Sequence, residues 1–203
     1  MIGIIDYGLG NLGSIQNMLK VIGAKSVISS DITILEKCDK YILPGVGAFD
    51  AGMSQLTEKG LADFVKKIAT IDKKPILGIC LGMQLLGRRS DEGELEGLGL
   101  IPFETVRFQL ENTNLKIPHM GWDVVDFKKN NPLVKNLKGK QRYYFVHSFH
   151  AKCDCEENIL MTCDYGYKFA AAVCKNNVMG VQFHPEKSHD FGMALLKNFV
   201  EEF

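Results

Sequence analysis

One ten-residue stretch, residues 75–84, constrains the fold of this 203-residue chain more than any other. It opens with a proline and an apolar run, and then places Cys80 between Gly78 and Gly82. This spacing is typical of a nucleophile elbow, in which a strand turns sharply into a helix and holds a strained, exposed nucleophile. Glycine on both sides permits the turn, because a side chain there would collide with the neighbouring strand or helix. The stretch predicts a buried strand, a tight turn at Cys80 and a helix beginning at Leu81.

A helix that starts at Leu81 would place free N–H groups and a positive dipole end beside the Cys80 sulfur. Such surroundings favour a thiolate and can bind an oxyanion. The alternative is a small core cysteine at the end of a strand, the usual role of an intracellular cysteine. The elbow pattern alone leaves both interpretations open.

Composition narrows the class of protein. Hydrophobic residues make up 46% of the chain and charged residues 24%, an ordinary globular balance that predicts a single domain over residues 1–203. Zero formal net charge and the absence of a basic block argue against a nucleic-acid partner. The first residues do not resemble a signal peptide and no apolar run reaches membrane-spanning length, so we expect a cytoplasmic protein with no membrane partner.

The six cysteines include no C-x-x-C pair. Cys153 and Cys155 lie near His150, but the usual zinc spacings are missing and the neighbouring residues are acidic. We therefore expect reduced thiols and neither a metal nor another cofactor.

The first half of the chain alternates between strand and helix patterns. Strands are predicted over residues 2–6, 25–29, 40–43 and 75–79, with amphipathic helical segments between them at 12–22 and 61–68. This alternation predicts right-handed crossovers and a parallel sheet covered on both faces.

The second half has a different texture. Short alternating segments at 105–110, 122–127, 143–146, 159–162, 169–173 and 178–183 predict an antiparallel meander. Residues 88–99 are charged and glycine-rich, which indicates a solvated turn. Ser188 is placed to cap a final helix whose apolar face includes Phe191, Leu195 and Phe199.

A cysteine nucleophile needs a base, and the base needs an orienting group. His184 and Glu186 flank Pro185 at the end of the last predicted strand. Proline pushes the residue before it into extended geometry, in which residues two apart face the same side. A carboxylate at Glu186 could then hold the imidazole of His184. The alternative is an edge histidine beside a solvated glutamate.

The loop at residues 44–48 has a second unusual backbone. Gly45 and Gly47 follow a predicted strand and permit a peptide to present its N–H toward a ligand. Together with the N–H after Cys80, such a donor would form an oxyanion hole.

The first loop suggests a different function. Gly8, Gly10 and Gly13 form a literal G-x-G-x-x-G after a strand, and Asp31 follows 18 residues after Gly13. This is compatible with a dinucleotide-binding oxidoreductase, although the motif is common by chance and leaves Cys80 without a role.

The elbow, the 44–49 loop and the 184–186 motif, in this order, resemble those of the class I (triad) glutamine amidotransferases. The likeness extends through residues 6–11, 118–122, 144–148 and 180–188, and is strongest to the glutaminase subunits of imidazole glycerol phosphate synthases. It implies a flavodoxin-like α/β fold with an antiparallel extension. It also implies hydrolysis of glutamine to glutamate and ammonia, with the ammonia passing to a (β/α)₈ synthase partner in a heterodimer.

The resemblance also assigns roles. Cys80 would be the nucleophile, His184 the general base and then acid, and Glu186 its orienter. Family positions for the oxyanion hole and the substrate match Val46, Gly47, Leu81, Gln84, Glu92, Ser148 and Phe149. Family positions facing the partner match Asn11, Trp122 and Lys187.

Two departures bear on the pathway. Asp123 stands where the subfamily usually has Asn, and Phe149-His150 stands where it tends to have Tyr followed by another residue. Such variation resembles sister amidotransferases that supply ammonia for amidination of surface-glycan sugars. Histidine biosynthesis and sugar amidination therefore both remain open, as does a catalytically idle scaffold for a synthase.

Overall fold

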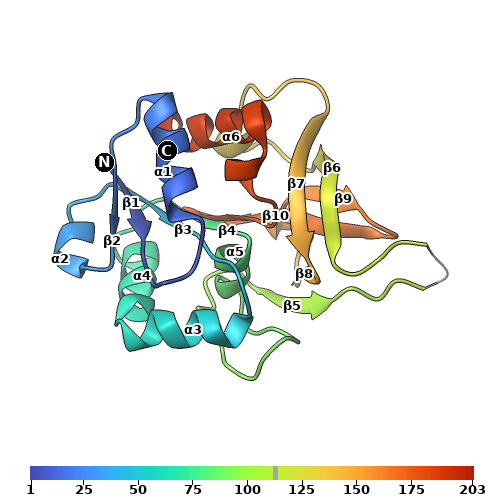
Figure 1. Ribbon diagram of the computed structural model, residues 1–203, viewed down its shortest axis with the longest axis horizontal. Helices are drawn as coiled ribbons and strands as arrows, with labels where there is room; N and C mark the ends of the chain where they lie inside the picture. Colours follow the sequence, from blue (N-terminus) through green and yellow to red (C-terminus); the bar gives the residue numbers. More distant parts are fainter. Residues whose placement is uncertain (112–113) are drawn as a thin grey trace.

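The computed structural model describes residues 1–111 and 114–203 (Figure 1). Five parallel strands form the centre of the sheet in the order β2–β1–β3–β4–β11. These strands are β1 (Ile2–Ile5), β2 (Ser26–Ser29), β3 (Lys40–Leu43), β4 (Ile76–Ile79) and β11 (Val178–Val181). The 2-1-3-4 order with one further parallel strand is that of flavodoxin-like folds, which confirms the predicted class.

Helices cover both faces of this parallel sheet. On one face are α1 (Leu12–Ile22) and α6 (His189–Glu201), whose buried side chains join one hydrophobic core. On the other are α2 (Ile32–Leu35), α3 (Phe49–Glu58), α4 (Leu61–Thr70) and α5 (Leu81–Leu85), which contribute to a second core. Figure 1 shows α1 and α6 above the sheet and α3 and α4 below it. The predicted parallel sheet with helices on both faces is therefore confirmed.

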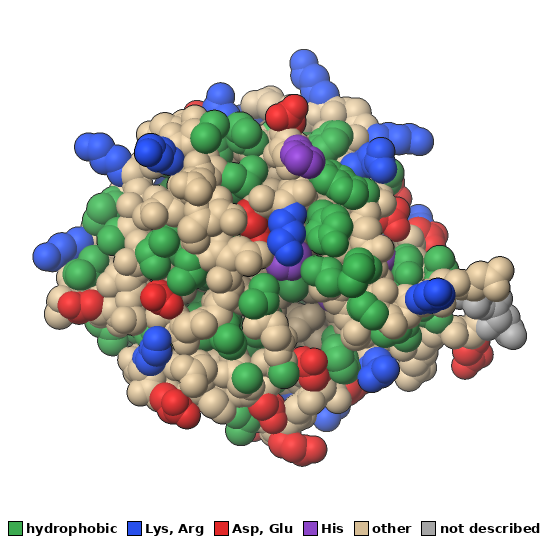
Figure 2. All heavy atoms as spheres, in the orientation of Figure 1, with side chains coloured by type: hydrophobic (Ala, Val, Ile, Leu, Met, Phe, Trp, Pro, Cys, Tyr) green, Lys and Arg blue, Asp and Glu red, His purple; other side chains and the backbone are tan. Residues whose placement is uncertain are grey.

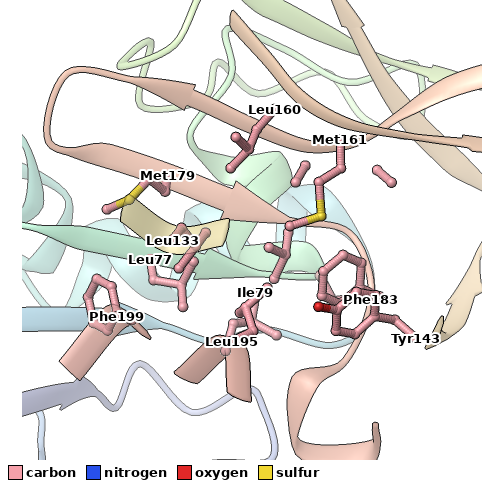
Figure 3. Close-up of a cluster of buried hydrophobic side chains, with 14 of the residues drawn as sticks. Leu77, Ile79, Leu133, Tyr143, Leu160, Met161, Met179, Phe183, Leu195 and Phe199 are labelled. Carbon is pink, nitrogen blue, oxygen red and sulfur yellow. The ribbon is translucent and has the colours of Figure 1, made fainter. Parts of the chain in front are cut away.

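Strand alternation divides the apolar residues between the two cores. Ile4 belongs to the core under α1 and α6, whereas its neighbour Ile5 belongs to the other. Figure 3 shows the first core, where Leu77 and Ile79 of β4 meet Leu195 of α6. Burying each of these aliphatic side chains stabilises the fold by roughly 1.5–3 kcal/mol.

An antiparallel extension continues the sheet beyond β11. Its path runs through β10, β9, β6 and β7, while β5 pairs with β8 and β8 pairs with β10. The strands are β5 (Phe103–Arg107), β6 (His119–Phe127), β7 (Gln141–His147), β8 (Phe149–Cys153), β9 (Ile159–Asp164) and β10 (Lys168–Lys175). Short 3₁₀ turns lie between β6 and β7 (η1, Pro132–Val134), between β8 and β9 (η2, Glu156–Asn158) and between β11 and α6 (η3, Pro185–Lys187).

The predicted simple meander is wrong in two respects. The strand β8 was not predicted, because a single residue, Ser148, separates it from β7 and no longer turn marks the boundary. In addition, β9 pairs with β6 rather than with its predecessor, and β11 runs parallel to β4. The first segment is also displaced, ending at Arg107 rather than 110, because pairing with β8 fixes β5 at Phe103–Arg107.

The predicted final helix exists, but Ser188 does not cap it through its side chain. The Ser188 hydroxyl instead donates to the carbonyl of His184 (2.6 Å) and accepts from the backbone N–H of Tyr144 (3.0 Å). Ser188 thus fastens the segment after β11 to β7, and thereby fixes the position of His184.

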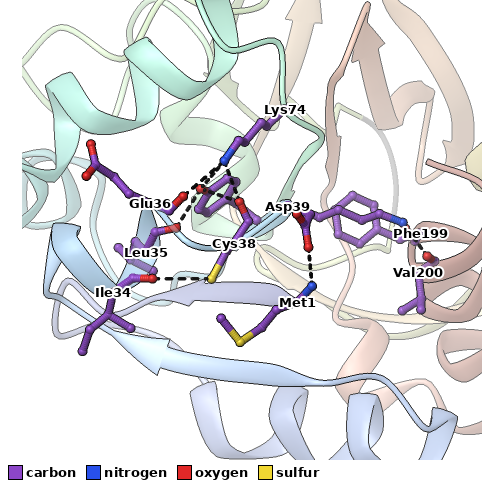
Figure 4. Close-up of polar contacts among 11 residues, drawn as sticks. Met1, Ile34, Leu35, Glu36, Cys38, Asp39, Lys74, Phe199 and Val200 are labelled. Atoms are coloured by element: carbon purple, nitrogen blue, oxygen red, sulfur yellow. Dashed lines mark hydrogen bonds and ion pairs between the residues drawn. The ribbon is translucent and has the colours of Figure 1, made fainter.

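Polar contacts secure the N-terminal edge of the sheet (Figure 4). The α-amino group of Met1 pairs with Asp39, and the ammonium group of Lys74 donates to the carbonyl of Cys38 (2.7 Å). Lys40 donates to the carbonyls of Phe199 and Val200 at the end of α6. Within the described residues, no helix has the length and apolar character needed to cross a membrane.

The arrangement of the parallel strands brings four loops together. Carboxyl ends of parallel strands meet at one edge of a sheet, where α/β folds bind their ligands. The loops after β1, β3, β4 and β11 all leave from this edge. They carry Asn11, Gly47, Cys80 and His184, respectively.

Gly82 offers a test of how tightly α5 packs on the sheet. A Cβ at Gly82 would collide with the carbonyl of Leu43, whereas one at Gly13 in α1 would meet nothing within 4 Å. We expect Gly82→Ala to lower the free energy of unfolding by more than 2 kcal/mol, since backbone has to move. We expect Gly13→Ala to stabilise the protein by about 0.4–1 kcal/mol. Urea unfolding of both variants measures this, and equal stabilities would contradict the packing account.

Candidate active site

Cys80 occupies the junction between β4 and α5 with φ 54° and ψ −112°. A positive φ is strained for a residue with a side chain, and such strain is characteristic of functional sites. A Cβ at Gly78 would lie 2.7 Å from the carbonyl oxygen of Gly82, so both flanking positions require glycine. The structure therefore has the sharp strand-to-helix turn that the sequence predicted.

His184 and Glu186 lie beside Cys80, contributed by the segment after β11. His184 Nδ1 is 2.7 Å from Glu186 Oε1, and the nearby Cys80 helps to raise the pKa of His184. Both side chains are almost completely buried, at 2% and 1% exposure. The three residues predicted as nucleophile, base and orienter are thus brought together in one cluster.

The geometry that joins His184 to Glu186 differs from the one expected. His184 is extended, at φ −100° and ψ 97°, but Pro185–Lys187 forms a 3₁₀ turn rather than a continuing strand. The turn folds Glu186 back toward the imidazole. The expected alternation along an extended chain was the wrong reason for the contact between the two side chains.

A cavity of about 610 Å³ opens on this triad. All seven residues assigned to oxyanion or substrate binding line it, namely Val46, Gly47, Leu81, Gln84, Glu92, Ser148 and Phe149. A larger hollow of about 910 Å³, bounded by residues 127–137 and Glu202, contains none of the triad. Figure 2 shows histidine side chains reaching the surface near the middle of the face drawn.

Two of these lining residues have further contacts. Glu92 Oε2 accepts the backbone N–H of Phe49 (2.9 Å) at the start of α3, so the loop at 88–99 is fixed and not merely a solvated turn. The side-chain amide of Gln84 donates to the carbonyl of Phe149 (3.3 Å) and to Gln182 (3.1 Å).

Three residues border the site without having been predicted. Gln182 donates its amide toward the Cys80 sulfur at 3.8 Å, and it could have been found because it stands two residues before His184, the spacing that puts side chains on one side of an extended chain. Tyr7 is buried with no hydrogen-bond partner for its hydroxyl among the described residues, and Cys80 acts on it electrostatically. Pro118, the residue before β6, also lines the cavity, and only the tertiary fold brings it there.

Comparison with known proteins assigns this geometry to a family. The family model described as "Glutamine amidotransferase class-I" matches residues 3–203. The chain belongs to this family. It is 53% identical to the imidazole glycerol phosphate synthase subunit HisH 2 of Methanococcus maripaludis over the full length of both chains. It is 50% identical to the HisH 2 subunit of Pseudomonas aeruginosa, covering 99% of each.

Solved structures agree on the fold of this amidotransferase. A structure titled as a glutamine amidotransferase superposes with TM-score 0.75 at 20% identity, covering 98% of this chain and 99% of that one. The PurLQS structure from Thermotoga maritima gives the same TM-score and identity, with 99% and 97% coverage.

The residues predicted to face a partner surround the amidotransferase triad. Asn11 donates its side-chain amide to Glu186 Oε1 (2.9 Å), so it belongs to the hydrogen-bond network of the triad as well. Trp122 is 38% exposed and stacks on His189, with ring centroids 5.4 Å apart. Lys187 is exposed over the ring of Tyr144 and also lines the cavity.

The dinucleotide alternative finds no support in this amidotransferase. Asp31, the acidic residue that a dinucleotide site would need, caps α2 by accepting from the N–H and hydroxyl of Thr33. The loop that carries Gly8 and Gly10 instead delivers Asn11 to Glu186. The parallel strands follow the flavodoxin-like order β2–β1–β3–β4–β11. This differs from the 3-2-1-4-5-6 order of the dinucleotide-binding fold.

His147, the other candidate for the base, is held neutral. Burial lowers the pKa of His147 to about 3, and its Nδ1 lies 2.7 Å from the carbonyl of Phe149. Its Nε2 lies 3.2 Å from His119. Both ring nitrogens are therefore engaged, which leaves His184 as the imidazole that faces the sulfur.

The pKa of His184 provides a test of the triad. Burial lowers this pKa, but the hydrogen bonds with Cys80 and Glu186 outweigh burial and raise it to about 9. Because the folded value exceeds the unfolded one of about 6.5, the stabilisation is complete below that pH and is lost as pH rises through about 9. We expect the His184 imidazole to titrate near pH 9 by NMR, and lower in Cys80→Ala and Glu186→Gln. A value near 6.5 in the wild type would contradict the geometry.

Proposed function

We propose that Cys80, His184 and Glu186 hydrolyse glutamine to glutamate and ammonia. The observation that carries this proposal is the buried line from Cys80 through His184 to Glu186 at the base of a cavity lined by the expected substrate residues. The chain is a glutamine amidotransferase by family, and we infer that residues 1–203 act as one catalytic domain.

The first step follows from this geometry. The sulfur of Cys80 attacks the side-chain amide carbon of glutamine, and His184 takes the thiol proton and returns it to the departing ammonia. Glu186 accepts from Nδ1, which keeps Nε2 toward the sulfur and stabilises the imidazolium that forms. Water then hydrolyses the thioester, with His184 as the base, and releases glutamate.

Backbone donors would stabilise the tetrahedral oxyanion. Leu81 is the first residue of α5 and lines the cavity, and its N–H precedes the hydrogen bonds of the helix. Gly47 supplies the second donor. Its φ of 99° and the open space around it allow the peptide before it to rotate without collision.

The substrate is held by the polar side chains of the cavity. Gln84 and Glu92 are proposed to bind the amino-acid end of glutamine, with Ser148 and Phe149 along the wall. Glu92 offers a carboxylate for the substrate's ammonium group, and the anchoring of its Oε2 at the start of α3 fixes its orientation.

We infer that the ammonia passes to a partner synthase subunit. The relatives at 46–53% identity are named subunits of imidazole glycerol phosphate synthase, which supports a cyclase partner that makes imidazole glycerol phosphate and AICAR in histidine biosynthesis. A biosynthetic subunit of this kind is expected in the cytoplasm, as a heterodimer with a (β/α)₈ chain. Exposed Met120 and Trp122 provide apolar area for such a contact.

A second acceptor pathway has a specific observation in its favour. Two relatives, at 53% and 50% identity, are numbered as a second HisH subunit, whereas another at 50% identity carries no number. This fits a duplicated glutaminase that serves a sister pathway such as sugar amidination. Copurification of the native partner, followed by assay with the histidine-pathway acceptor, separates the two. Failure of that partner to form imidazole glycerol phosphate would favour the sister pathway.

Substitutions in the triad test the chemistry. Cys80→Ala is expected to abolish glutaminase activity and labelling by a glutamine-like electrophile. Loss of the base in His184→Ala is expected to lower kcat by about 10⁵–10⁶, and loss of the orienter in Glu186→Gln by about 10⁴. Cys155→Ala, which alters an exposed thiol, serves as the control and keeps full activity. Labelling that maps to Cys153 or Cys174 would overturn the assignment.

A second prediction concerns activation by the partner. If the loop at residues 44–48 mostly holds the donor peptide turned away, the free chain lacks one oxyanion donor, which lowers the rate by about 10²–10³. A partner that binds only the donor-inward state restores that factor. Asn11→Ala is expected to reduce the activation, since it removes the bond to Glu186, whereas exposed Asn130→Ala leaves it unchanged. The measurement is glutamine turnover of the chain alone against the chain saturated with partner and acceptor. Equal rates would rule out the switch.

A further inference from the structure

Three potential metal ligands converge on β6 and β9, on the far side of His147 from the cavity. His119, Asp123 and Cys163 offer a ring nitrogen, a carboxylate oxygen and a sulfur that all lie within 4.8 Å of one another. His119 Nε2 and Asp123 Oδ2 are 3.4 Å apart. Cys163 joins them because it pairs with Val125, which shares a strand face with Asp123.

The backbone of β6 bends to bring two of these residues together. Residues four apart on a regular strand are separated by about 13 Å, too far for His119 and Asp123 to touch. Gly121 lies midway between them with φ 138°, a backbone angle that favours glycine. The departure from extended geometry at this residue accounts for the short distance between the two side chains.

A chain of hydrogen bonds fixes the tautomer of His119. The carbonyl of Phe149 can only accept, so His147 Nδ1 must carry the proton in the 2.7 Å contact between them. Neutral His147 then has only a lone pair on Nε2. His119 Nδ1, 3.2 Å from that nitrogen, must therefore be the donor. It follows that neutral His119 directs a lone pair from Nε2 toward Asp123.

That lone pair faces a group that cannot satisfy it. An asparagine could donate an N–H to Nε2, but the carboxylate of Asp123 also has only lone pairs. One of its oxygens, Oδ1, is already oriented by the backbone N–H of Val124 at 2.8 Å. Two acceptors 3.4 Å apart repel each other unless a proton or a metal cation lies between them, and the sulfur of Cys163 beside them adds a third potential metal ligand.

We propose that His119, Asp123 and Cys163 form a site for a divalent transition-metal ion of the zinc type. Nitrogen, carboxylate and sulfur ligands in combination select zinc-like ions over magnesium or calcium. With bond lengths of about 2.0–2.3 Å, tetrahedral ligands lie about 3.4–3.7 Å apart, so the His119–Asp123 pair already has the required spacing. Binding expels the thiol proton of Cys163 to solvent and leaves the fourth position for water.

The surroundings of the site are those of a metal centre. His119 is stacked between Phe145 and Tyr165, with centroids 4.7 and 3.9 Å away, which fixes its ring plane. His147 supplies the second hydrogen bond that metal-binding histidines commonly make through their other nitrogen.

Charge and access also suit a cation. The carboxylates of Asp123, Asp126 and Asp164 all act electrostatically on Cys163. The Asp123 side chain is 36% exposed, which gives an ion a route from solvent, while the His119 side chain is 3% exposed.

Cobalt(II) provides a direct probe of this site. The full chain carrying Cys80→Ala, so that the active-site thiol cannot bind metal, is stripped with a chelator and titrated with cobalt(II). We expect one equivalent to bind, with an intense near-ultraviolet thiolate-to-cobalt band and release of about one proton per ion. Zinc(II) is then expected to displace the cobalt and raise the melting temperature.

Matched variants assign the ligands. Cys163→Ala is expected to remove the thiolate band, and Asp123→Asn to weaken zinc binding at least ten-fold. Cys155→Ala and Asp63→Asn, which alter an exposed thiol and an exposed carboxylate outside the site, are the controls and leave both unchanged. If Cys163→Ala unfolds, anomalous scattering from a zinc-soaked crystal of the parent chain locates the ion instead. Absence of a thiolate band, its persistence in Cys163→Ala, or an ion located elsewhere would overturn the proposal.

Discussion

The close approach of α5 to the end of β3 is the constraint on which the active site depends. A side chain at Gly82 would collide with the carbonyl of Leu43, and one at Gly45 would lie 2.8 Å from the backbone nitrogen of Gly82. Because these backbones touch, the chain has no room to leave β4 except through the strained turn at Cys80. The same contact places the loop at 44–48 beside the sulfur. The proposed nucleophile and the proposed oxyanion donor are therefore positioned by a single packing interaction.

The sequence predicted the features that depend on local chemistry. Apolar periodicity located the parallel strands and α1, and two glycines around Cys80 indicated the elbow. What it could not supply was pairing between distant segments. No turn precedes β8 to mark its start. The pairing of β9 with β6 depends on contacts between distant segments, which no local sequence pattern encodes. The contact between His184 and Glu186 was predicted, yet a 3₁₀ turn creates it.

The candidate site shows the same division. Residues in motifs, such as Cys80 and His184, could be identified in advance. Gln182 was within reach of prediction through strand alternation. The dual role of Asn11, which touches Glu186 from the first loop, needed the fold, because 175 residues separate the two in sequence.

Hydrogen-bond direction connects the active site to the wall behind it. Gln182 donates toward the Cys80 sulfur, and Gln84 donates both to Gln182 and to the carbonyl of Phe149. The same carbonyl accepts from His147, which in turn accepts from His119. Each hydrogen bond determines which ring nitrogen of the next histidine carries the proton. A change in charge beside His119 would therefore alter the hydrogen bond that His147 donates to the carbonyl of Phe149, which also accepts from Gln84. A cation near Asp123 would in this way be coupled to the substrate cavity through His119, His147 and the carbonyl of Phe149.

The active site also holds some of the unfavourable features of the structure. Glu186 Oε1 receives both His184 and Asn11, while its buried Oε2 has no partner in the described part of the chain. Leaving a buried acceptor unsatisfied costs about 1–3 kcal/mol, and more for a charged group. The hydroxyl of Tyr7 is likewise unpartnered there, and Cys80 adds backbone strain. An unneutralised carboxylate stabilises the imidazolium that the reaction needs, so the cost to stability supports catalysis. A variant that satisfied Oε2 with a donor would gain stability and lose part of the field that holds the charged form of His184.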